Sequence, residues 1–243
     1  MTRKRTLIGM LTPSSNTALE PITTMMLAGL PDTSAHFGRF RVTQIALNDT
    51  ALKQFDDSNI LAAAELLADA ELHAIAWNGT SSSWLGFEAD ETLCRRITER
   101  TGIPAGTSVL ALNEVLRATG ARDIAFVTPY TDDVQEKINA NYAYAGFNVV
   151  AERHLGLSHN FSFSEVTPAQ LTAMVHEVAA ARPQAISMLC TNLMSAPLVE
   201  TLEREIGIPI YDSISTAVWK CLKLAGVDPK RVAGWGRMFR EVA

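Results

Sequence analysis

The chain has 243 residues, of which 47% are apolar and 19% charged, with a formal net charge of -5 and a pI near 5.6. This composition is typical of a globular protein with one large or two small cores, and it excludes a nucleic-acid backbone as the main partner, because such binders concentrate Lys and Arg. No apolar stretch approaches the roughly 20 residues that span a bilayer, and no signal-peptide apolar region is present, so we expect a cytoplasmic protein without a membrane partner.

Short β-rich runs alternate with amphipathic segments, as in βα units built around a parallel sheet. In the first half we predict strands over Thr6 to Thr12, Phe40 to Leu47, Ala74 to Trp77 and Pro104 to Gly106, with helices that include Asn59 to Ala70 and Glu88 to Thr101. In the second half we predict strands over Ile124 to Thr128, Val149 to Arg153, Ala185 to Met188 and Ile208 to Tyr211. The helices of that half are predicted over Asp132 to Ala145, Thr167 to Ala181, Pro197 to Ile206 and Ser215 to Ala225.

Three short matches indicate that one module occurs twice in the chain. They pair Leu11-Thr12-Pro13 with Val127-Thr128-Pro129, Ala74 through Gly79 with Ala185 through Cys190, and Gly102-Ile103-Pro104 with Gly207-Ile208-Pro209. The matches keep their order, and glycines at 102, 120, 207 and 226 stand where helix C-caps are expected in both copies. We therefore predict two α/β domains, residues 1–118 and 119–227, the first completed by a segment of about 228–243 that crosses back.

The two copies differ where chemistry is expected. In open parallel sheets, ligands bind beyond the carboxyl ends of the strands. There the second copy has Cys190-Thr191-Asn192 and the first has Gly79-Thr80-Ser81. A single thiol is thus predicted to face a hydroxyl-rich loop across a pseudo-two-fold axis.

Cys190 is the candidate for acid–base chemistry. It follows a strand-like run and precedes a predicted helix, and a thiol near a helix start has a depressed pKa that lets it shuttle a proton. The alternative is a buried structural cysteine. Cys94 and Cys221 lie within predicted helices and are interpreted as packing residues. Three cysteines without a C-x-x-C pair, and five histidines without ligand spacing, predict neither disulfides nor a catalytic metal.

The other candidates each have a plainer alternative. The run Gly79 to Ser83 offers N–H groups and hydroxyls for an oxyanion or carboxylate. Ser14-Ser15-Asn16 is a second carboxylate cradle or an ordinary N-cap. Tyr130 is an oxyanion donor or a packed aromatic residue. Asn160 is a candidate only because of its predicted loop position, and its alternative is a turn residue. Trp84 and Phe87 are either a lid or part of the core.

Four ordered motifs along nearly the whole chain resemble the arylmalonate decarboxylases of the aspartate/glutamate racemase superfamily. They are Gly79-Thr80-Ser81 with Ser83, Tyr130-Thr131-Asp132-Asp133-Val134, Cys190, and Gly234-Trp235-Gly236-Arg237-Met238-Phe239. Pro13-Ser14-Ser15-Asn16-Thr17 and Asn160 are more similar to the related maleate cis-trans isomerases. The resemblance implies two pseudo-symmetric, flavodoxin-like α/β/α domains with parallel sheets and an active site in the cleft between them.

The resemblance also implies a reaction. Racemases of the superfamily use two cysteines, and maleate isomerases carry both, the first as nucleophile; arylmalonate decarboxylases have glycine at the first position, as here at Gly79. The implied activity is cofactor-independent decarboxylation of a substituted malonate-like dicarboxylate. Thr80, Ser81, Tyr130 and the Thr191 N–H would bind one carboxylate while Cys190 protonates the enediolate. Maleate-type isomerisation and a non-catalytic carboxylate-binding protein are the alternatives.

Departures from the decarboxylase pattern leave the substrate open. Asn16 and Asn160 suggest that the protein binds both carboxylates of a diacid. Asn192 replaces the small residue expected at this position in the decarboxylases. The predicted substrate-binding set is Pro13, Ser14, Asn16, Gly79, Asn160, Thr191 and Asn192. A polar malonate or an unsaturated diacid fits this set better than an aryl compound. The partner is thus a small dicarboxylate, and the sequence allows a monomer or a small homo-oligomer.

Overall fold

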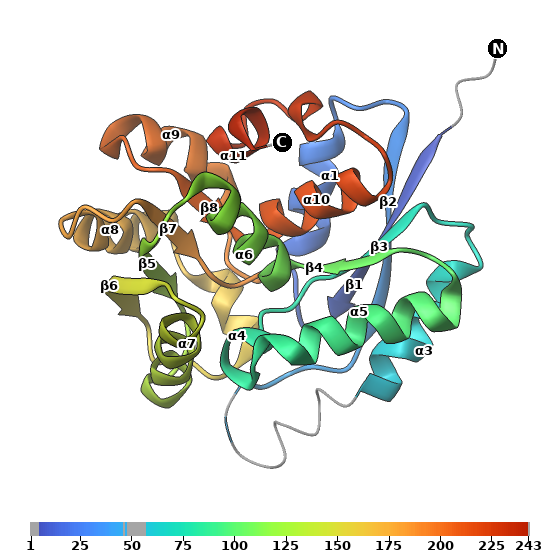
Figure 1. The fold of residues 1–243 in the computed structure, drawn as a ribbon, viewed down its shortest axis with the longest axis horizontal. Coiled ribbons are helices and arrows are strands. Elements are labelled where there is room, and N and C mark those ends of the chain that lie inside the picture. The colour runs from blue at the N-terminus through green and yellow to red at the C-terminus, as the bar shows by residue number, and fades with distance from the viewer. Residues whose placement is uncertain (1–4, 46, 48–56, 243) are drawn as a thin grey trace.

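Two four-stranded parallel sheets form the framework of the protein (Figure 1). The computed structural model describes residues 5–45, 47 and 57–242. The first sheet has the order β2-β1-β3-β4, with β1 at Thr6–Pro13, β2 at Thr33–Phe40, β3 at Ala74–Trp77 and β4 at Ala105–Thr107. The second has the order β6-β5-β7-β8, with β5 at Asp123–Thr128, β6 at Asn148–His154, β7 at Ala185–Met188 and β8 at Ile210–Asp212.

The two sheets repeat each other in order and register. Ile8 to Leu11 of β1 pair with Ala74 to Trp77 of β3, and Ile124 to Val127 of β5 pair with Ala185 to Met188 of β7 in the same way. The central strands β3 and β7 are wholly buried, as expected for a parallel sheet covered on both faces. The predicted α/β class with two pseudo-symmetric parallel sheets is confirmed.

Helices cover both sheets. In the first half they are α1 (Leu19–Leu27), α3 (Asp57–Ala68), α4 (Ser82–Leu85), α5 (Phe87–Thr101) and α6 (Ser108–Thr119). In the second half they are α7 (Asp132–Tyr144), η2 (Asn160–Glu165), α8 (Pro168–Ala179), α9 (Ala196–Ile206), α10 (Ser213–Leu224), η3 (Pro229–Arg231) and α11 (Arg237–Glu241).

Local capping residues set the ends of several of these helices. Thr107 accepts a hydrogen bond from the Leu110 N–H at the start of α6, and α6 ends at Gly120 with φ at 70°. Such a left-handed C-cap favours glycine because a Cβ is disfavoured there. The helix α5 ends in the same way at Gly102 and α9 at Gly207, as the repeat predicted.

The predicted strand over Phe40 to Leu47 is wrong. The edge strand β2 is Thr33–Phe40, which pairs residue by residue with β1 from Thr6 to Pro13. Of the residues that follow, those described leave the sheet, and the Ile45 N–H donates to the Ser158 carbonyl at 2.8 Å. An edge strand pairs on one side only, so its sequence pattern is weak, whereas the β-branched residues after it form another buried surface.

The helix α10 joins the two halves. It follows β8 of the second sheet but packs against β3, β4 and α6 of the first (Figure 1). Its N-terminus is capped by Asp212, whose carboxylate accepts from the Ile214 and Ser215 N–H groups. In the described part of residues 228–243 the chain forms η3 and α11 and adds no strand to the first sheet, while Arg231 pairs with Asp32 at 2.6 Å.

Candidate active site

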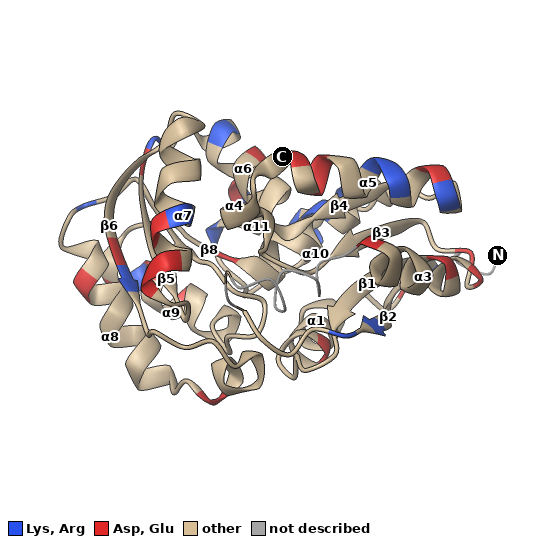
Figure 2. Cartoon of the chain, turned by 90° about the horizontal axis from the view of Figure 1, so that it is seen from below, with Lys and Arg blue, Asp and Glu red and all other residues tan. Residues whose placement is uncertain are grey.

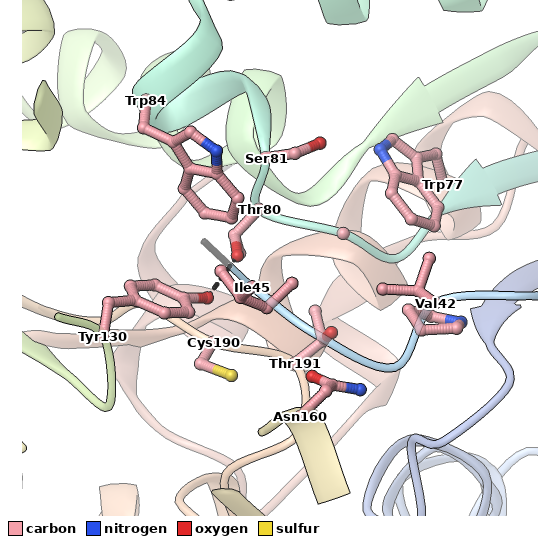
Figure 3. Close-up of a pocket in the computed structure, with 12 residues that line it drawn as sticks. Val42, Ile45, Trp77, Thr80, Ser81, Trp84, Tyr130, Asn160, Cys190 and Thr191 are labelled. Carbon is pink, nitrogen blue, oxygen red and sulfur yellow. Dashed lines mark hydrogen bonds between the residues drawn. The ribbon is translucent and has the colours of Figure 1, made fainter. Parts of the chain in front are cut away.

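The loops after the central strands of both sheets meet around one small cavity (Figure 3). Its free volume is about 20 Å³, which is enough for roughly one water molecule. The lining residues are Pro13, Val42, Ile45, Trp77, Gly79, Thr80, Ser81, Trp84, Tyr130, Asn160, Cys190 and Thr191. The site therefore lies at the carboxyl edges of the strands, where ligands of parallel α/β sheets bind.

The hydroxyl-rich loop crosses from β3 to α4. The Thr80 Oγ1 lies 2.5 Å from the Tyr130 hydroxyl, so the two halves are joined inside the cavity. The Ser81 side chain lines the cavity and hydrogen-bonds to no described residue, and the same holds for the backbone N–H groups of Thr80, Ser81 and Thr191. These groups can donate to an anion without giving up another partner.

Tyr130 stands two residues after the end of the strand β5 and is buried. Burial raises the pKa of its phenol well above the ordinary value, and the nearby Cys190 thiol adds to the shift. The hydroxyl is therefore protonated at neutral pH and available as a donor. The Trp84 ring packs edge-on against Tyr130 at 5.1 Å, and Phe163 packs at 5.7 Å, which holds the phenol in place.

Cys190 lies just after β7, and its thiol is not activated by a helix. Burial raises its pKa to about 12, although the Asn192 N–H, at 3.4 Å from Sγ, and the Tyr130 hydroxyl lower it. The predicted pKa depression is wrong for two reasons. The helix α9 begins only at Ala196. Removal of the thiolate from water raises the pKa by more than the hydrogen bonds from Asn192, Tyr130 and Leu193 lower it. At neutral pH Cys190 is a neutral acid.

The predicted substrate-binding residues divide into two groups. Pro13, Gly79, Asn160 and Thr191 line the cavity, whereas Ser14, Asn16 and Asn192 do not. The Asn16 Nδ2 donates to the Thr191 carbonyl at 2.9 Å, and its Oδ1 accepts from the Ala18 and Leu19 N–H groups. This side chain caps the start of α1 and fastens it to the Cys190 loop.

Asn192 has a similar bridging position. Its Oδ1 accepts from the Thr17 N–H at 2.9 Å and its Nδ2 donates to the Asn160 carbonyl at 2.6 Å. The Asn160 Nδ2 in turn donates to the Ser15 Oγ at 2.8 Å. The amides therefore form a network that connects the two halves behind the cavity, and only Asn160 reaches its wall.

Sequence reasoning missed the apolar wall. Val42, Ile45, Trp77 and Trp84 line the cavity together with the hydroxyl groups. Phe87 packs away from it, against the Tyr142 ring at 5.2 Å. Val42 and Ile45 resemble a strand in sequence, and Trp77 resembles a core residue. Their role depends on contacts with the other half, such as the Asn160 N–H to the Thr43 carbonyl at 3.0 Å.

The described residues bring no formal charge to the cavity. None of its 12 lining residues is Lys, Arg, Asp or Glu, and Figure 2 shows charged residues mainly on outer elements such as α5, α7 and β6. An anion bound here would be stabilised by neutral hydroxyl and N–H donors. Among the described residues, no group of three or more His, Cys, Asp or Glu is arranged to hold a metal ion. None of the helices described is both long enough and apolar enough to cross a membrane.

The paired parallel sheets and the cysteine cavity between their carboxyl edges define an enzyme of the Asp/Glu racemase superfamily. A family model described as arylmalonate decarboxylase matches residues 8–239. The chain belongs to the arylmalonate decarboxylase/maleate isomerase family.

Relatives from both branches of this family are similar to the chain. The arylmalonate decarboxylase of Bordetella bronchiseptica is 32% identical over 168 residues, 67% of this chain and 69% of that protein. The maleate isomerase of Nocardia farcinica is 26% identical over 241 residues, 96% of this chain and 95% of that protein.

Solved structures divide in the same way. A Nocardia farcinica maleate cis-trans isomerase mutant with a covalently bound succinylcysteine intermediate superposes with a TM-score of 0.89 at 25% identity, covering 98% of this chain and 99% of that one. A crystal structure of arylmalonate decarboxylase gives 0.78 at 26% identity, covering 97% and 99%. The family is therefore established, and it contains both reactions.

Proposed function

We propose that the protein is a cofactor-independent decarboxylase of a substituted malonate-like dicarboxylic acid, with Cys190 as the proton donor. The observation that carries this proposal is the single cysteine of the cavity. Of the three cysteines, only Cys190 lines it, and the equivalent position in the first half is Gly79. One thiol can supply a proton from one side, whereas two-base racemisation needs a second group.

The protonation state of Cys190 supports its role as an acid. A thiol with a pKa of about 12 retains its proton at neutral pH, so it is poorly suited to resting nucleophilic attack, which requires thiolate. The other described lining side chains that can donate are hydroxyls, the Asn160 amide and the indole N–H groups of Trp77 and Trp84. Cys190 is the one thiol among the described lining residues, and we assign the proton transfer to carbon to it.

The hydroxyl loop supplies the stabilisation that decarboxylation needs. One substrate carboxylate accepts hydrogen bonds from Thr80, Ser81 and Tyr130, together with backbone N–H groups of the loops that bond to no described residue. Each well-placed donor contributes about 3 kcal/mol to an oxyanionic transition state. The second carboxylate lies against the uncharged wall, where loss of water destabilises it relative to carbon dioxide.

The reaction then proceeds in two steps. The bond between the α-carbon and the second carboxylate breaks, carbon dioxide leaves, and the electron pair forms an enediolate on the retained carboxylate. The Cys190 S–H bond next breaks as its proton bonds to the α-carbon. The resulting thiolate accepts hydrogen bonds from the Asn192 N–H and Tyr130, and it regains a proton from water when the product leaves.

Substrate entry requires movement of the wall. A malonate is far larger than the free volume of about 20 Å³. The residues at 41–45 and 158–160 close the cavity through backbone hydrogen bonds of 2.8 and 3.0 Å. These contacts have to part for a diacid to bind, and their return excludes water during the reaction.

The test is a panel of malonates, including methylmalonate, phenylmalonate and 2-methyl-2-phenylmalonate, incubated in deuterated water. We expect carbon dioxide release and a mono-deuterated, optically active acid. Cys190→Ala should lower kcat by roughly 10²- to 10⁴-fold, the usual contribution of a general acid. Cys94→Ala, in α5 and away from the cavity, is the matched control. Absence of carbon dioxide across the panel would refute the proposal.

Maleate-type isomerisation is the second candidate. It is favoured by the polar side chain of Asn160 in the cavity wall and by similarity over 96% of the chain to a maleate isomerase. Conversion of maleate to fumarate, followed by proton NMR and abolished in Cys190→Ala, would establish it. Tight binding of small dicarboxylates without turnover of any substrate would instead support a binding protein.

A further inference from the structure

Trp77 occupies the space that a side chain at position 79 would need. A Cβ built on Gly79 would lie 1.9 Å from the Cζ2 of Trp77, 2.4 Å from Cε2 and 2.5 Å from Cη2. Real Cβ atoms do not approach other heavy atoms below 3.0 Å. With the indole in this position, residue 79 can only be glycine.

The indole has little freedom to move aside. Trp77 ends the strand β3, is 1% exposed, and packs against the Phe40 ring at 5.0 Å between ring centroids. The clashing atoms belong to a rigid aromatic ring in a close-packed surrounding, where a shift of a methylene group already costs stability. A side chain at position 79 would therefore have to displace buried packing.

In the second half, the residue equivalent to Gly79 carries a side chain, and the residue equivalent to Trp77 carries no aromatic ring. Met188 stands two residues before Cys190, as Trp77 stands two residues before Gly79, and each ends its strand. The second half thus brings a thiol to the cavity, and the first half brings an indole. Figure 3 shows the Trp77 ring and the Cys190 thiol entering the cavity from different sides.

We propose that Trp77 is a specificity-determining residue that limits the reaction to one face of the substrate. Its indole takes the place of a second proton donor and keeps water from the face opposite Cys190. This inference rests on the proposed function, since it explains why an enediolate formed here is protonated from the Cys190 side. It predicts that a thiol at position 79 becomes useful only when the indole is removed.

The test compares the parent with Gly79→Cys, Trp77→Leu and the double variant. Leucine retains apolar bulk at position 77 but lacks every ring atom of the clash. Gly29→Cys is the matched control, because a Cβ there meets no atom within 4 Å. Gly79→Cys alone should lower the thermal midpoint by roughly 2–12 °C, as expected for overpacking in a chain of this size. Gly29→Cys should leave it nearly unchanged.

In the double variant the two substitutions should be coupled. Its thermal midpoint should lie above the value expected from adding the two single changes. It should also racemise a supplied enantiomer of 2-phenylpropionate at least tenfold faster than either single variant, with deuterium entering at the α-carbon. In that exchange one thiolate removes the α-proton and the opposite thiol, which has exchanged with the deuterated solvent, donates a deuteron to the other face, so the acid changes only in configuration and in the isotope at the α-carbon.

Either of two results would overturn the inference. One is a Gly79→Cys protein as stable as Gly29→Cys, which would mean that Trp77 does not fill the space. The other is a double variant that racemises no faster than Gly79→Cys, which would mean that the indole does not restrict the reacting face. The thermal midpoint and the racemisation rate do not depend on decarboxylation. Failure of the proposed function would appear separately, as absence of carbon dioxide release by the parent.

Discussion

Removal of the Tyr130 hydroxyl isolates one donor of the oxyanion site. In Tyr130→Phe the ring remains, and with it the packing against Trp84 at 5.1 Å and Phe163 at 5.7 Å. The hydrogen bond of 2.5 Å with Thr80 is lost. The change therefore removes a donor from the reacting region without creating a cavity.

The magnitude follows from this geometry. One oxyanion donor is worth about 2.7–4 kcal/mol, so kcat should fall by roughly 10²- to 10³-fold. The hydroxyl also stabilises the Cys190 thiolate formed after proton transfer. We therefore expect a fall in kcat near the upper end of this range. Because burial raises the phenol pKa well above its ordinary value, ionisation of Tyr130 should produce no inflection in the pH–rate profile near neutrality.

The assay is kcat for the best malonate of the panel, measured beside thermal unfolding. Tyr142→Phe is the matched control, because Tyr142 is equally buried and its hydroxyl has no hydrogen-bond partner in the described part of the chain. It should retain parental kcat. A loss of less than about fivefold in Tyr130→Phe, or an equal loss in Tyr142→Phe, would refute the assigned donor role.

Two further predictions concern Cys190 and Asn16. With a pKa of about 12, only about 10⁻⁴ of the Cys190 thiol is ionised at pH 8 against about 10⁻¹ for an ordinary thiol, so alkylation should be roughly a thousandfold slower and should accelerate up to pH 10. The Asp212 carboxylate raises this pKa, so Asp212→Asn should accelerate alkylation; an unchanged rate at every pH would contradict the assignment. Asn16→Ala should lower the free energy of unfolding by about 1–3 kcal/mol in denaturant titrations, through loss of a helix cap and of the bond to Thr191. A raised KM with unchanged stability would instead indicate direct contact with substrate.

The repeat and the position of Cys190 were readable from local patterns. Two parallel sheets follow from alternating β-rich and amphipathic segments, and the cavity follows from the rule that ligands bind at the carboxyl ends of parallel strands. These rules placed the hydroxyl loop, Tyr130 and Cys190 at that edge. Gly79, Thr80 and Ser81 of the loop line the cavity together with Tyr130 and Cys190. Such features depend on periodicity and chain order, which the sequence contains directly.

The edge strand and the amides required the tertiary structure. Val42 and Ile45 have strand-forming side chains, yet they lie across the cavity because the other half offers Ser158 as a backbone partner. Asn16 and Asn192 look like carboxylate ligands in sequence, yet contacts with Thr191, Thr17 and Asn160 already use their amides. Long-range partners decide which polar groups are left for a ligand, and no local pattern encodes them.

The sequence by itself determined that one copy of the module carries a thiol and the other a glycine, since residue identity needs no folding to be known. Only the tertiary structure decided why position 79 is a glycine. The space beside Gly79 is filled by the Trp77 indole, and burial sets the Cys190 pKa high instead of low. Packing and desolvation both arise from atoms that the chain brings together over long sequence distances, which is why they appear only in the folded protein.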